Sequence, residues 1–449
     1  MTKYIYLAST IMPNYKQFCF DDYDIIGFDL DCTLLRYNIN EMIPLVYELL
    51  RKFLVEKKSY PRSLLRRKLD KSFMQKGLII DAENGNILKL SGDGTILRAA
   101  HGTKLLTPEE IIAIYGVERK WSVSSQFLKD PLSTWNGPLS EKMRTLLDYF
   151  DFSASLVFAQ AVDLIDAQAI SANSSHPPRY NVWPDIQEGL IEIYSRENFS
   201  NTKSEYFAAL KAQPERYLRK TSPNVIRWIR ELRGSGKALF LLTGSNIDFA
   251  NLTATFCLGI NWLDLFDSVV CFAKKPGYFV FNRPYFEIET CALSEVPNSQ
   301  LDLNSNLQMN RAYSQGNWEQ LRRALALKCG KEVSNVRSLY LGDNLIQDVY
   351  APVKHRDLDT VAVCEELLAE NSSGTSLHEY EYAEIVSSSF WGSYFRIEST
   401  PTLWAEIISN YSQLCIPLLD HVAKKPITHK FFCENGDGYY PEPPTALEL

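Results

Sequence analysis

The sequence lacks the long uncharged apolar run that a membrane-spanning helix needs, because no such run reaches roughly 18 residues. Residues 1–20 also lack a basic segment followed by an apolar core, and they lack an arginine-rich amphipathic pattern. Those patterns mark exported and organellar proteins, so we expect no targeting segment. Together these absences predict a cytoplasmic protein that has no membrane partner.

Paired cysteines are also lacking, since the nine cysteines are odd in number, scattered, and never spaced as Cys-x-x-Cys. Several lie inside apolar runs, which favours buried reduced thiols over disulfides or a zinc site. Cys32 is the exception, because it lies among acidic residues. A nucleophilic thiolate there would need a base or a cation beside it, and no histidine is close to it in the sequence.

An excess of positive charge is the third absence. The chain has 47 Lys and Arg residues against 54 Asp and Glu residues, which gives a net charge of −7. This balance argues against nucleic acid as a partner, and an anionic substrate would need local cations. With 45% hydrophobic and 22% charged residues the composition is ordinary for a globular protein, and 449 residues suggest two or three domains.

The most informative stretch is Asp29-Leu30-Asp31-Cys32-Thr33, which follows the apolar run of residues 23–28. Such a run predicts a buried parallel strand that delivers carboxylates to the edge of a sheet, where open α/β sheets bind ligands. Asp29 and Asp31 are two positions apart, so their side chains can face one cavity. Two acids in one cavity can divide the chemistry, because one can attack while the other moves protons.

Two other interpretations of this acidic motif are a plain turn and the start of a calcium-binding loop. Carboxylates at alternate positions do suit hard cations. A calcium loop that began at Asp29 would need Gly at its sixth position and Glu at its twelfth, where the sequence has Leu34 and Asn40. The calcium loop is therefore excluded, while the turn stays open.

A second strand is predicted over residues 238–242, after a helix that begins at Ser222-Pro223 and ends at Gly234. The strand runs into Thr243-Gly244-Ser245. A hydroxyl group and unhindered backbone N–H groups converge there, as phosphate binding requires. A plain turn from strand to helix is the alternative.

Two further strands end in charged residues. The strand at 268–272 leads to Lys275, which can neutralise phosphate charge, although one lysine alone is a weak signal. The strand at 337–341 ends in Gly342-Asp343, with Asp348 five residues later. Acids at the end of a buried strand favour Mg²⁺ over simple packing, because an unpaired buried carboxylate is costly. A strand at 360–364 and a helix at 401–418 are expected to complete the sheet.

Between the first two strands lies a segment of domain size, residues 35–222. We expect helices at 41–56, 140–169 and 185–194, and a β-meander at 77–102 with turns at Asn-Gly and Asp-Gly. The basic residues of 57–76 are interpreted as a solvated helix face, with screening of an anionic substrate as the alternative. Residues 436–449, rich in Pro and acids, are predicted to be a mobile tail.

The order of these strand ends, with Asp/Asp, Thr, Lys and Asp, resembles the haloacid dehalogenase (HAD) superfamily. Segments 27–34, 77–86, 100–102 and 341–343 are similar to the cytosolic purine 5′-nucleotidase family. The resemblance spans about residues 20–420. It implies an α/β fold, with an HAD-like Rossmannoid core of parallel sheet at 1–34 and 223–425, a large mixed α+β cap at 35–222 inserted after the first motif, and a tail at 426–449.

The resemblance also implies a Mg²⁺-dependent phosphomonoesterase that acts on a small phosphorylated substrate, such as a nucleotide, through an aspartyl-phosphate. The resemblance implies that Asp29 is the nucleophile and that Asp31 is the acid and base. It implies that phosphate is bound by Thr243, Gly244, Ser245 and Lys275. The implied metal ligands are Asp29, Asp31 and Asp343, with Asp348 as a supporting acid. Asp31 would hold the metal through its backbone carbonyl, and Asp348 would orient Lys275 or a metal-bound water.

The helix predicted at 185–194 departs from the purine-specific enzymes, because it has Gln and Ile where Arg and Asp are expected. That departure leaves two alternatives beside hydrolysis. One is a catalytically weak binding or scaffolding protein, and the other is transfer of the phosphoryl group to a nucleoside. The oligomeric state stays open.

Overall fold

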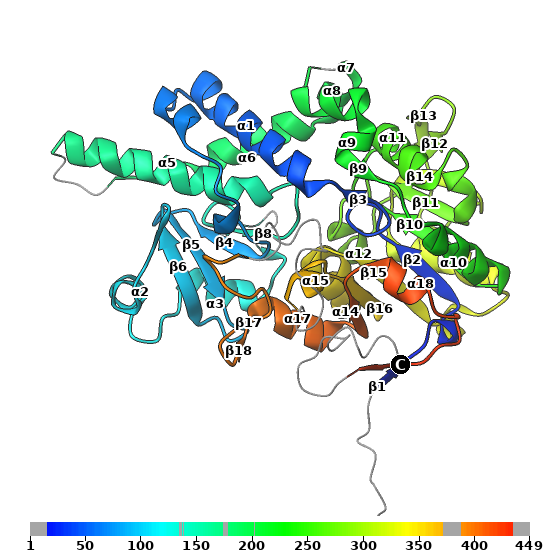
Figure 1. Ribbon diagram of the computed structural model, residues 1–449. Helices are drawn as coiled ribbons and strands as arrows, with labels where there is room; N and C mark the ends of the chain where they lie inside the picture. Colours follow the sequence, from blue (N-terminus) through cyan, green and yellow to red (C-terminus); the bar gives the residue numbers. More distant parts are fainter. Residues whose placement is uncertain are drawn as a thin grey trace, which may run out of the picture.

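The computed structural model describes residues 16–433 except 134–136, 138, 174–177, 202 and 371–387. Its main element is a nine-stranded sheet in the order β13-β12-β14-β11-β10-β2-β15-β16-β19 (Figure 1). The strands from β14 to β19 in that order run parallel to one another. The hairpin of β12 and β13 is antiparallel and forms one edge. The α/β, Rossmann-like core expected from the sequence is confirmed.

The strands of this sheet follow the predicted ones and add others. The predicted strands are β2 (Ile25–Phe28), β10 (Ala238–Leu242), β11 (Ser268–Cys271), β15 (Ser338–Gly342) and β16 (Asp359–Val363). The additional strands are β12 (Tyr285–Glu289), β13 (Ser294–Gln300), β14 (Arg311–Gln315) and β19 (Leu414–Ile416).

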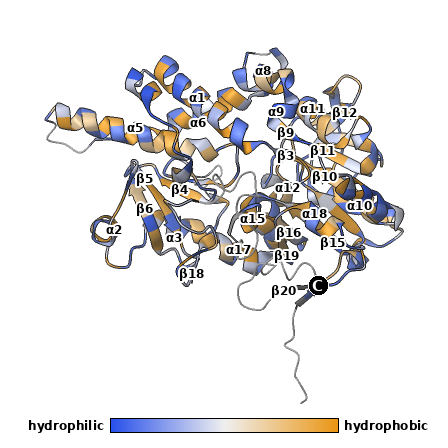
Figure 2. Ribbon diagram, viewed as in Figure 1, coloured by the Kyte–Doolittle hydropathy of each residue, from blue (hydrophilic) through white to orange (hydrophobic). Residues whose placement is uncertain are grey.

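Helices cover both faces of the large sheet, as a parallel sheet requires. Leu239 and Leu241 of β10 pack in one cluster with Trp228 of α10 (Pro223–Gly234). Phe240 and its neighbour Leu242 pack in another cluster, which includes Trp318 of α13 (Trp318–Lys328). The central strands β2, β10 and β15 are accordingly buried at every position, and the middle of the sheet is largely hydrophobic (Figure 2).

Gly27 is required at the centre of this sheet. It pairs with Phe240 of β10 on one side and with Tyr340 of β15 on the other. The rings of Phe240 and Tyr340 are stacked with centroids 5.8 Å apart, and a Cβ atom at position 27 would lie 2.0 Å from the Phe240 ring. Only glycine leaves room for this aromatic pair. The Tyr340 hydroxyl in turn accepts a hydrogen bond from Lys275.

A second sheet is antiparallel and has the order β7-β6-β5-β4-β8. Its strands are β4 (Leu78–Asp81), β5 (Asn86–Leu90), β6 (Ile96–His101), β7 (Lys104–Leu105) and β8 (Met143–Leu146). The helices that pack beside it are α2 (Pro108–Tyr115), α3 (Ser122–Lys129) and α5 (Phe152–Ser171) (Figure 1). Helices α1 (Ile39–Lys57) and α6 (Trp183–Tyr194) pack against α5, and α7 (Arg196–Asn201) and α8 (Glu205–Ala212) pack against α6.

The segment expected as a cap leaves and rejoins the core at one place, because β3 (Arg36–Tyr37) pairs with β9 (Leu218–Arg219). The backbone at 390–392 also holds this segment. The Phe390 carbonyl accepts from Arg98 at 2.8 Å, and the Gly392 carbonyl accepts from Gln75 at 2.7 Å. The domain boundaries drawn from the sequence stay a prediction.

Three predicted helical segments are wrong in detail. Residues 140–169 contain strand β8 before helix α5 begins. Residues 401–418 contain α17 (Leu403–Tyr411) and then the edge strand β19. Residues 57–76 form only short 3-10 turns, at Arg62–Arg66 and Lys71–Phe73. In the first two segments a short apolar run adjoins a longer helix, and periodicity cannot separate such a run from the helix.

The ends of the described chain meet, because β1 (Lys16–Phe18) pairs with β20 (Phe431–Cys433), which lies in the stretch expected as a tail. The predicted mobile tail at 436–449 lies outside the described residues, as do residues 1–15 of the N-terminal stretch. No described helix combines the length and apolarity that crossing a bilayer requires.

Candidate active site

The carboxyl ends of β2, β10, β11 and β15 surround a cavity of about 210 Å³. The side chains or backbones of Asp29, Asp31, Gly244, Ser245, Lys275, Asp343 and Asp348 line it. Residues more than 300 positions apart in the sequence therefore meet at one edge of the sheet. Thr243 is fully buried just behind this lining.

Lys275 is the centre of the charged network in this cavity. Its Nζ atom lies 2.8 Å from Asp29 Oδ1 and 2.6 Å from Asp348 Oδ1. It also donates a hydrogen bond of 3.1 Å to the hydroxyl of Tyr340, the partner of Phe240 above. The two carboxylates raise the pKa of Lys275 although burial opposes them, so the lysine is a fixed cation at neutral pH.

Backbone pairing beyond the strand ends positions Lys275. The Ala273 N–H donates to the Thr243 carbonyl at 3.0 Å, and the Phe272 N–H donates to the Ser245 carbonyl at 2.8 Å. The loops after β10 and β11 are thus held together. The residues that the sequence assigns to phosphate binding consequently come from two adjacent loops.

Asp29 and Asp31 have different neighbours. Burial raises the pKa of Asp29 to about 8, and although Lys275 opposes this shift, the nearby carboxylates of Asp348 and Asp31 add to it. Asp31 accepts hydrogen bonds from the Tyr37 hydroxyl at 2.6 Å and from the Ser245 hydroxyl at 2.7 Å. Desolvation raises the pKa of Asp31, and these two hydrogen bonds counteract it in part.

Thr243 and Ser245 lie next to the second acid. The Thr243 hydroxyl lies 3.4 Å from Asp31 Oδ2 and accepts a bond of 3.0 Å from the Ser245 N–H. Gly244 leaves open space, because a Cβ atom there would meet nothing within 4 Å. The Gly244 backbone is therefore the most accessible part of this loop for an anion.

Three carboxylates could hold a metal ion. One oxygen each of Asp29, Asp343 and Asp348 lies within 4.8 Å of the others. Asp343 Oδ2 is buried without a hydrogen-bond partner, which is a costly state that a cation would relieve. An all-carboxylate set of this kind fits a hard divalent cation such as Mg²⁺.

Asp348 uses both of its carboxylate oxygens in contacts with neighbouring residues. One of its oxygens contacts Lys275, and the other accepts from the Asn344 N–H at 3.2 Å. Gly342 makes room for it, since a Cβ atom at position 342 would lie 2.4 Å from the Asp348 Cβ. Asp348 is thereby suited to orienting Lys275.

Cys32 lines the cavity but is poorly suited to nucleophilic attack. Burial raises the pKa of its thiol well above the ordinary value, and the carboxylate of Asp343 raises it further. A low pKa is what a reactive thiolate needs. The buried free thiols Cys19, Cys257, Cys271, Cys364 and Cys415 agree with the reduced state expected from the sequence.

Sequence reasoning missed three groups in this network. Tyr37 and Tyr340 bind Asp31 and Lys275, and Lys76 lies 3.9 Å from Asp343. None of them stands in a motif, so no local signal distinguished them. The sequence does carry a signal for Asn344, because an Asn after a strand and before a helical segment is a typical N-cap. In the structure its side chain accepts hydrogen bonds from the N–H groups of Ile346 and Gln347.

Two larger cavities adjoin the catalytic one, with volumes of about 290 Å³ and 730 Å³. Phe150 and Gly244 line all three cavities. Gln187, on the helix that departs from the purine-specific enzymes, lines the largest. The aromatic side chains around this space are Phe150, Trp183, Tyr194, Phe199, Phe207, Phe249 and Phe272.

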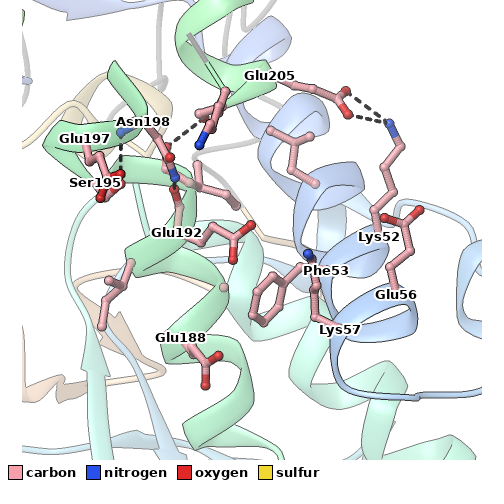
Figure 3. Close-up of a pocket in the computed structure, with 16 residues that line it drawn as sticks. Lys52, Phe53, Glu56, Lys57, Glu188, Glu192, Ser195, Glu197, Asn198 and Glu205 are labelled. Carbon is pink, nitrogen blue, oxygen red and sulfur yellow. Dashed lines mark hydrogen bonds and ion pairs between the residues drawn. The ribbon is translucent and has the colours of Figure 1, made fainter. Parts of the chain in front are cut away.

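A further cavity of about 530 Å³ lies between α1 and helices α6 to α8 (Figure 3). It shares no lining residue with the catalytic cavity. Lys52 on one wall is paired with Glu205 at 3.1 Å, and glutamates outnumber lysines around the opening. The cavity is therefore unsuited to a phosphate ester.

Comparison with known proteins gives a consistent result. A profile of the 5′ nucleotidase family matches residues 16–384. The human 5′-nucleotidase domain-containing protein 1 is 33% identical over 94% of this chain and 96% of its own length, and the bovine protein of that name has the same values. The human 5′-nucleotidase domain-containing protein 2 is 23% identical over 78% of this chain and 62% of its own length.

Proposed function

Because the chain belongs to the 5′ nucleotidase family and is therefore a hydrolase of the phosphatase type, we propose that it is a Mg²⁺-dependent phosphomonoesterase for nucleoside monophosphates. The observation that carries this proposal is the ion-paired network of Asp29, Lys275 and Asp348 beside Asp343 in one cavity. A nucleophile, a fixed cation and metal-binding carboxylates are then within reach of one phosphoryl group.

Asp29 is the proposed nucleophile. Its carboxylate oxygen attacks phosphorus, so that a bond to Asp29 forms while the bond from phosphorus to the ester oxygen breaks. Asp31 donates its proton to the departing oxygen. In the second half, Asp31 accepts a proton from the water that attacks the aspartyl-phosphate, which releases inorganic phosphate and restores Asp29.

The surroundings of Asp31 support its role as acid and base. Burial raises the pKa of Asp31, which favours the protonated form that the first step requires. The hydroxyls of Tyr37 and Ser245 hold its two oxygens from different sides. Asp31 can therefore lose and regain a proton without changing its orientation.

Lys275, the Gly244 N–H and the Thr243 hydroxyl are proposed to hold the phosphate oxygens, and the Ser245 hydroxyl is proposed to join them when Asp31 is protonated and no longer accepts its proton. Asp348 fixes the ammonium group of Lys275 before the substrate arrives. Such preorganised donors stabilise charge that grows in the transition state.

The carboxylates of Asp29 and Asp343 and the backbone carbonyl of Asp31 are proposed to hold Mg²⁺. When it is bound, the ion reduces the repulsion between the anionic nucleophile and the anionic substrate.

The adjoining cavities support a bulky leaving group with a ring. Their aromatic side chains offer stacking surfaces, and Gln187, Asn246 and Gln315 offer amide groups that can both donate and accept hydrogen bonds. A nucleoside has both features. We further propose that the enzyme acts in the cytoplasm, which suits its free thiols.

The test is phosphate release from a panel of nucleoside monophosphates and small phosphoesters. Wild-type protein with Mg²⁺ should release phosphate, and EDTA or the change Asp29→Asn should abolish release from every substrate. The matched control is Asp70→Asn, which alters an exposed acid and should leave activity unchanged.

Three results would count against the proposal. Persistent turnover by Asp29→Asn would refute the nucleophile. No release from any substrate would favour a binding or scaffolding protein. Formation of a new monophosphate when a nucleoside is added would favour phosphoryl transfer, which uses the same aspartyl-phosphate.

A further inference from the structure

Lys76 is a buried lysine that the proposed chemistry leaves without a role. It lies two residues before β4 of the antiparallel sheet, and its side chain is only 2% exposed. Its Nζ atom lies 3.9 Å from Asp343 Oδ2 and 3.6 Å from Glu366 Oε1. A buried lysine is costly unless it is paired, so its two carboxylate neighbours explain why the charge can be placed there.

The distance to Asp343 is informative. At 3.9 Å the ammonium group attracts Asp343 Oδ2 but is too far away to form a hydrogen bond with it. The same oxygen has no hydrogen-bond partner elsewhere. Lys76 therefore balances the charge of Asp343 while its oxygen stays available to a cation.

Lys76 is itself held from several sides. Glu366, at the start of α15 (Glu366–Glu370) after β16, is 1% exposed and accepts a hydrogen bond of 3.2 Å from the Tyr149 hydroxyl. The Lys76 ammonium lies 5.0 Å from the centre of the Tyr149 ring. Tyr149 and Lys76 come from the inserted segment, whereas Glu366 and Asp343 come from the core.

The backbone on both sides of Lys76 is also fixed. The Gln75 side chain donates to the Gly392 carbonyl at 2.7 Å, and the Gly77 carbonyl accepts from the Trp404 indole at 2.7 Å. The Gly77 N–H donates to Leu146 of β8 at 2.6 Å. The lysine is thus presented to Asp343 by a rigid support rather than by a mobile loop.

We propose that Lys76 is a positioning residue that holds Asp343 in the orientation in which it binds the divalent cation, and that it links the inserted segment to the metal site. This inference rests on the proposed function, because it assumes that Asp343 is a metal ligand. Without Lys76, the buried carboxylates of Asp343 and Glu366 would face each other with no cation between them. Their mutual repulsion would move Asp343 away from its binding orientation.

The test is Mg²⁺ binding measured by calorimetry on the full-length protein, with Mg²⁺ alone and no substrate. Lys76→Met should weaken Mg²⁺ binding about 10–100-fold, which is the usual effect of removing a residue that orients a metal ligand. Lys76→Arg keeps the positive charge and should restore most of the affinity. If Lys76→Met does not fold, Lys76→Gln replaces it with the same expectation.

Lys237 provides the matched control. It is a buried lysine immediately before β10 that donates to the Tyr23 carbonyl at 2.8 Å, and it does not line the catalytic cavity. Lys237→Met should lower the melting temperature in EDTA at least as much as Lys76→Met, but it should leave Mg²⁺ affinity unchanged. A purely structural role for Lys76 would predict the same behaviour for both variants.

Equal or tighter Mg²⁺ binding by Lys76→Met, with wild-type protein binding normally, would overturn this inference alone. Tighter binding would mean that the lysine merely opposes the cation. Failure of the wild-type protein to bind Mg²⁺ would overturn the proposed function and this inference with it.

Discussion

Asp29 and Asp31 lie two residues apart, yet their side chains have different partners. Asp29 contacts the Lys275 cation at 2.8 Å, whereas Asp31 accepts hydrogen bonds from the hydroxyls of Tyr37 and Ser245. Burial raises the pKa of Asp29, and the cation opposes that shift and so favours the charged form that the proposed nucleophile needs, while neutral hydroxyls tolerate both protonation states. At the scale of single residues, the environment rather than the residue type assigns the two roles.

Tyr37 should tune the second acid. Its hydrogen bond lowers the pKa of Asp31, so Tyr37→Phe should raise that pKa. If Asp31 must be protonated to release the leaving group, the alkaline limb of the pH profile of kcat should move to higher pH. Tyr23→Phe removes a bond of 2.8 Å to Asp359 far from the catalytic cavity and should leave the profile unchanged. An unshifted profile in Tyr37→Phe would contradict the assignment of Asp31.

The raised pKa of Asp29 predicts a pH dependence of stability in the metal-free protein. An acid whose pKa is about 8 when folded and near 4 when unfolded keeps its proton only in the folded state over that range. Its contribution to stability is therefore present at low pH and is lost as the pH rises toward about 8. Asp29→Asn is always neutral and escapes this loss.

Melting temperatures in EDTA should accordingly diverge. Relative to wild-type protein, Asp29→Asn should gain stability between about pH 5 and about pH 8, and the gain should level off above that pH. A constant difference between the two proteins across that range would contradict the raised pKa.

At the scale of elements, the sheet supports the site through its packing. The stack of Phe240 and Tyr340 fills the space that Gly27 leaves, and Tyr340 accepts a hydrogen bond from Lys275. The position of Lys275 thus depends on a glycine in the middle of β2. Glycine normally weakens a strand, so close packing of another side chain is the reason for its presence.

Gly27→Ala should therefore be destabilising. The added Cβ atom would lie 2.0 Å from the Phe240 ring, and overpacking of this kind typically costs about 1–3 kcal/mol. The free energy of unfolding in urea would measure it. Gly234→Ala is the control, because a Cβ atom there meets nothing within 4 Å and alanine suits a helix. Equal stability of both variants would mean that the stack shifts without cost.

At the scale of the whole molecule, the catalytic cavity lies where the large sheet meets the inserted segment. Asp29, Asp343 and Lys275 come from the sheet, whereas Phe150 and Asp148 come from the segment. Arg196, at the start of α7, joins the two through a contact of 3.1 Å with Asp248 of α11 (Ile247–Leu258). A ligand that binds in this cavity should stabilise both parts together.

Mg²⁺ should therefore raise the melting temperature of the whole protein in one transition. Binding at about 100 times the dissociation constant adds about 2.7 kcal/mol to the stability of the folded state. Asp343→Asn should abolish this gain, and a sodium salt at matched ionic strength should not reproduce it. A thermal melt monitored by circular dichroism would test this. If Mg²⁺ stabilised Asp343→Asn as much as wild-type protein, Asp343 would not be a ligand of the metal.

The sequence determined the strands that carry the site and the acids, threonine and lysine at their ends. It could do so because strand periodicity and strand ends are local properties, and because parallel strands all end at the same edge of a sheet. The sequence also indicated Gly342, the glycine of the Gly-Asp motif, which leaves room for Asp348.

Only the tertiary structure decided which other groups complete the site. Lys76 lies beside both Asp343 and Glu366, and these three residues come from separate parts of the chain. Tyr37 reaches Asp31 from β3, at the start of the inserted segment. The strand β19 likewise exists because it pairs with β16. Contacts between residues far apart in the sequence depend on register and packing, which no local pattern encodes.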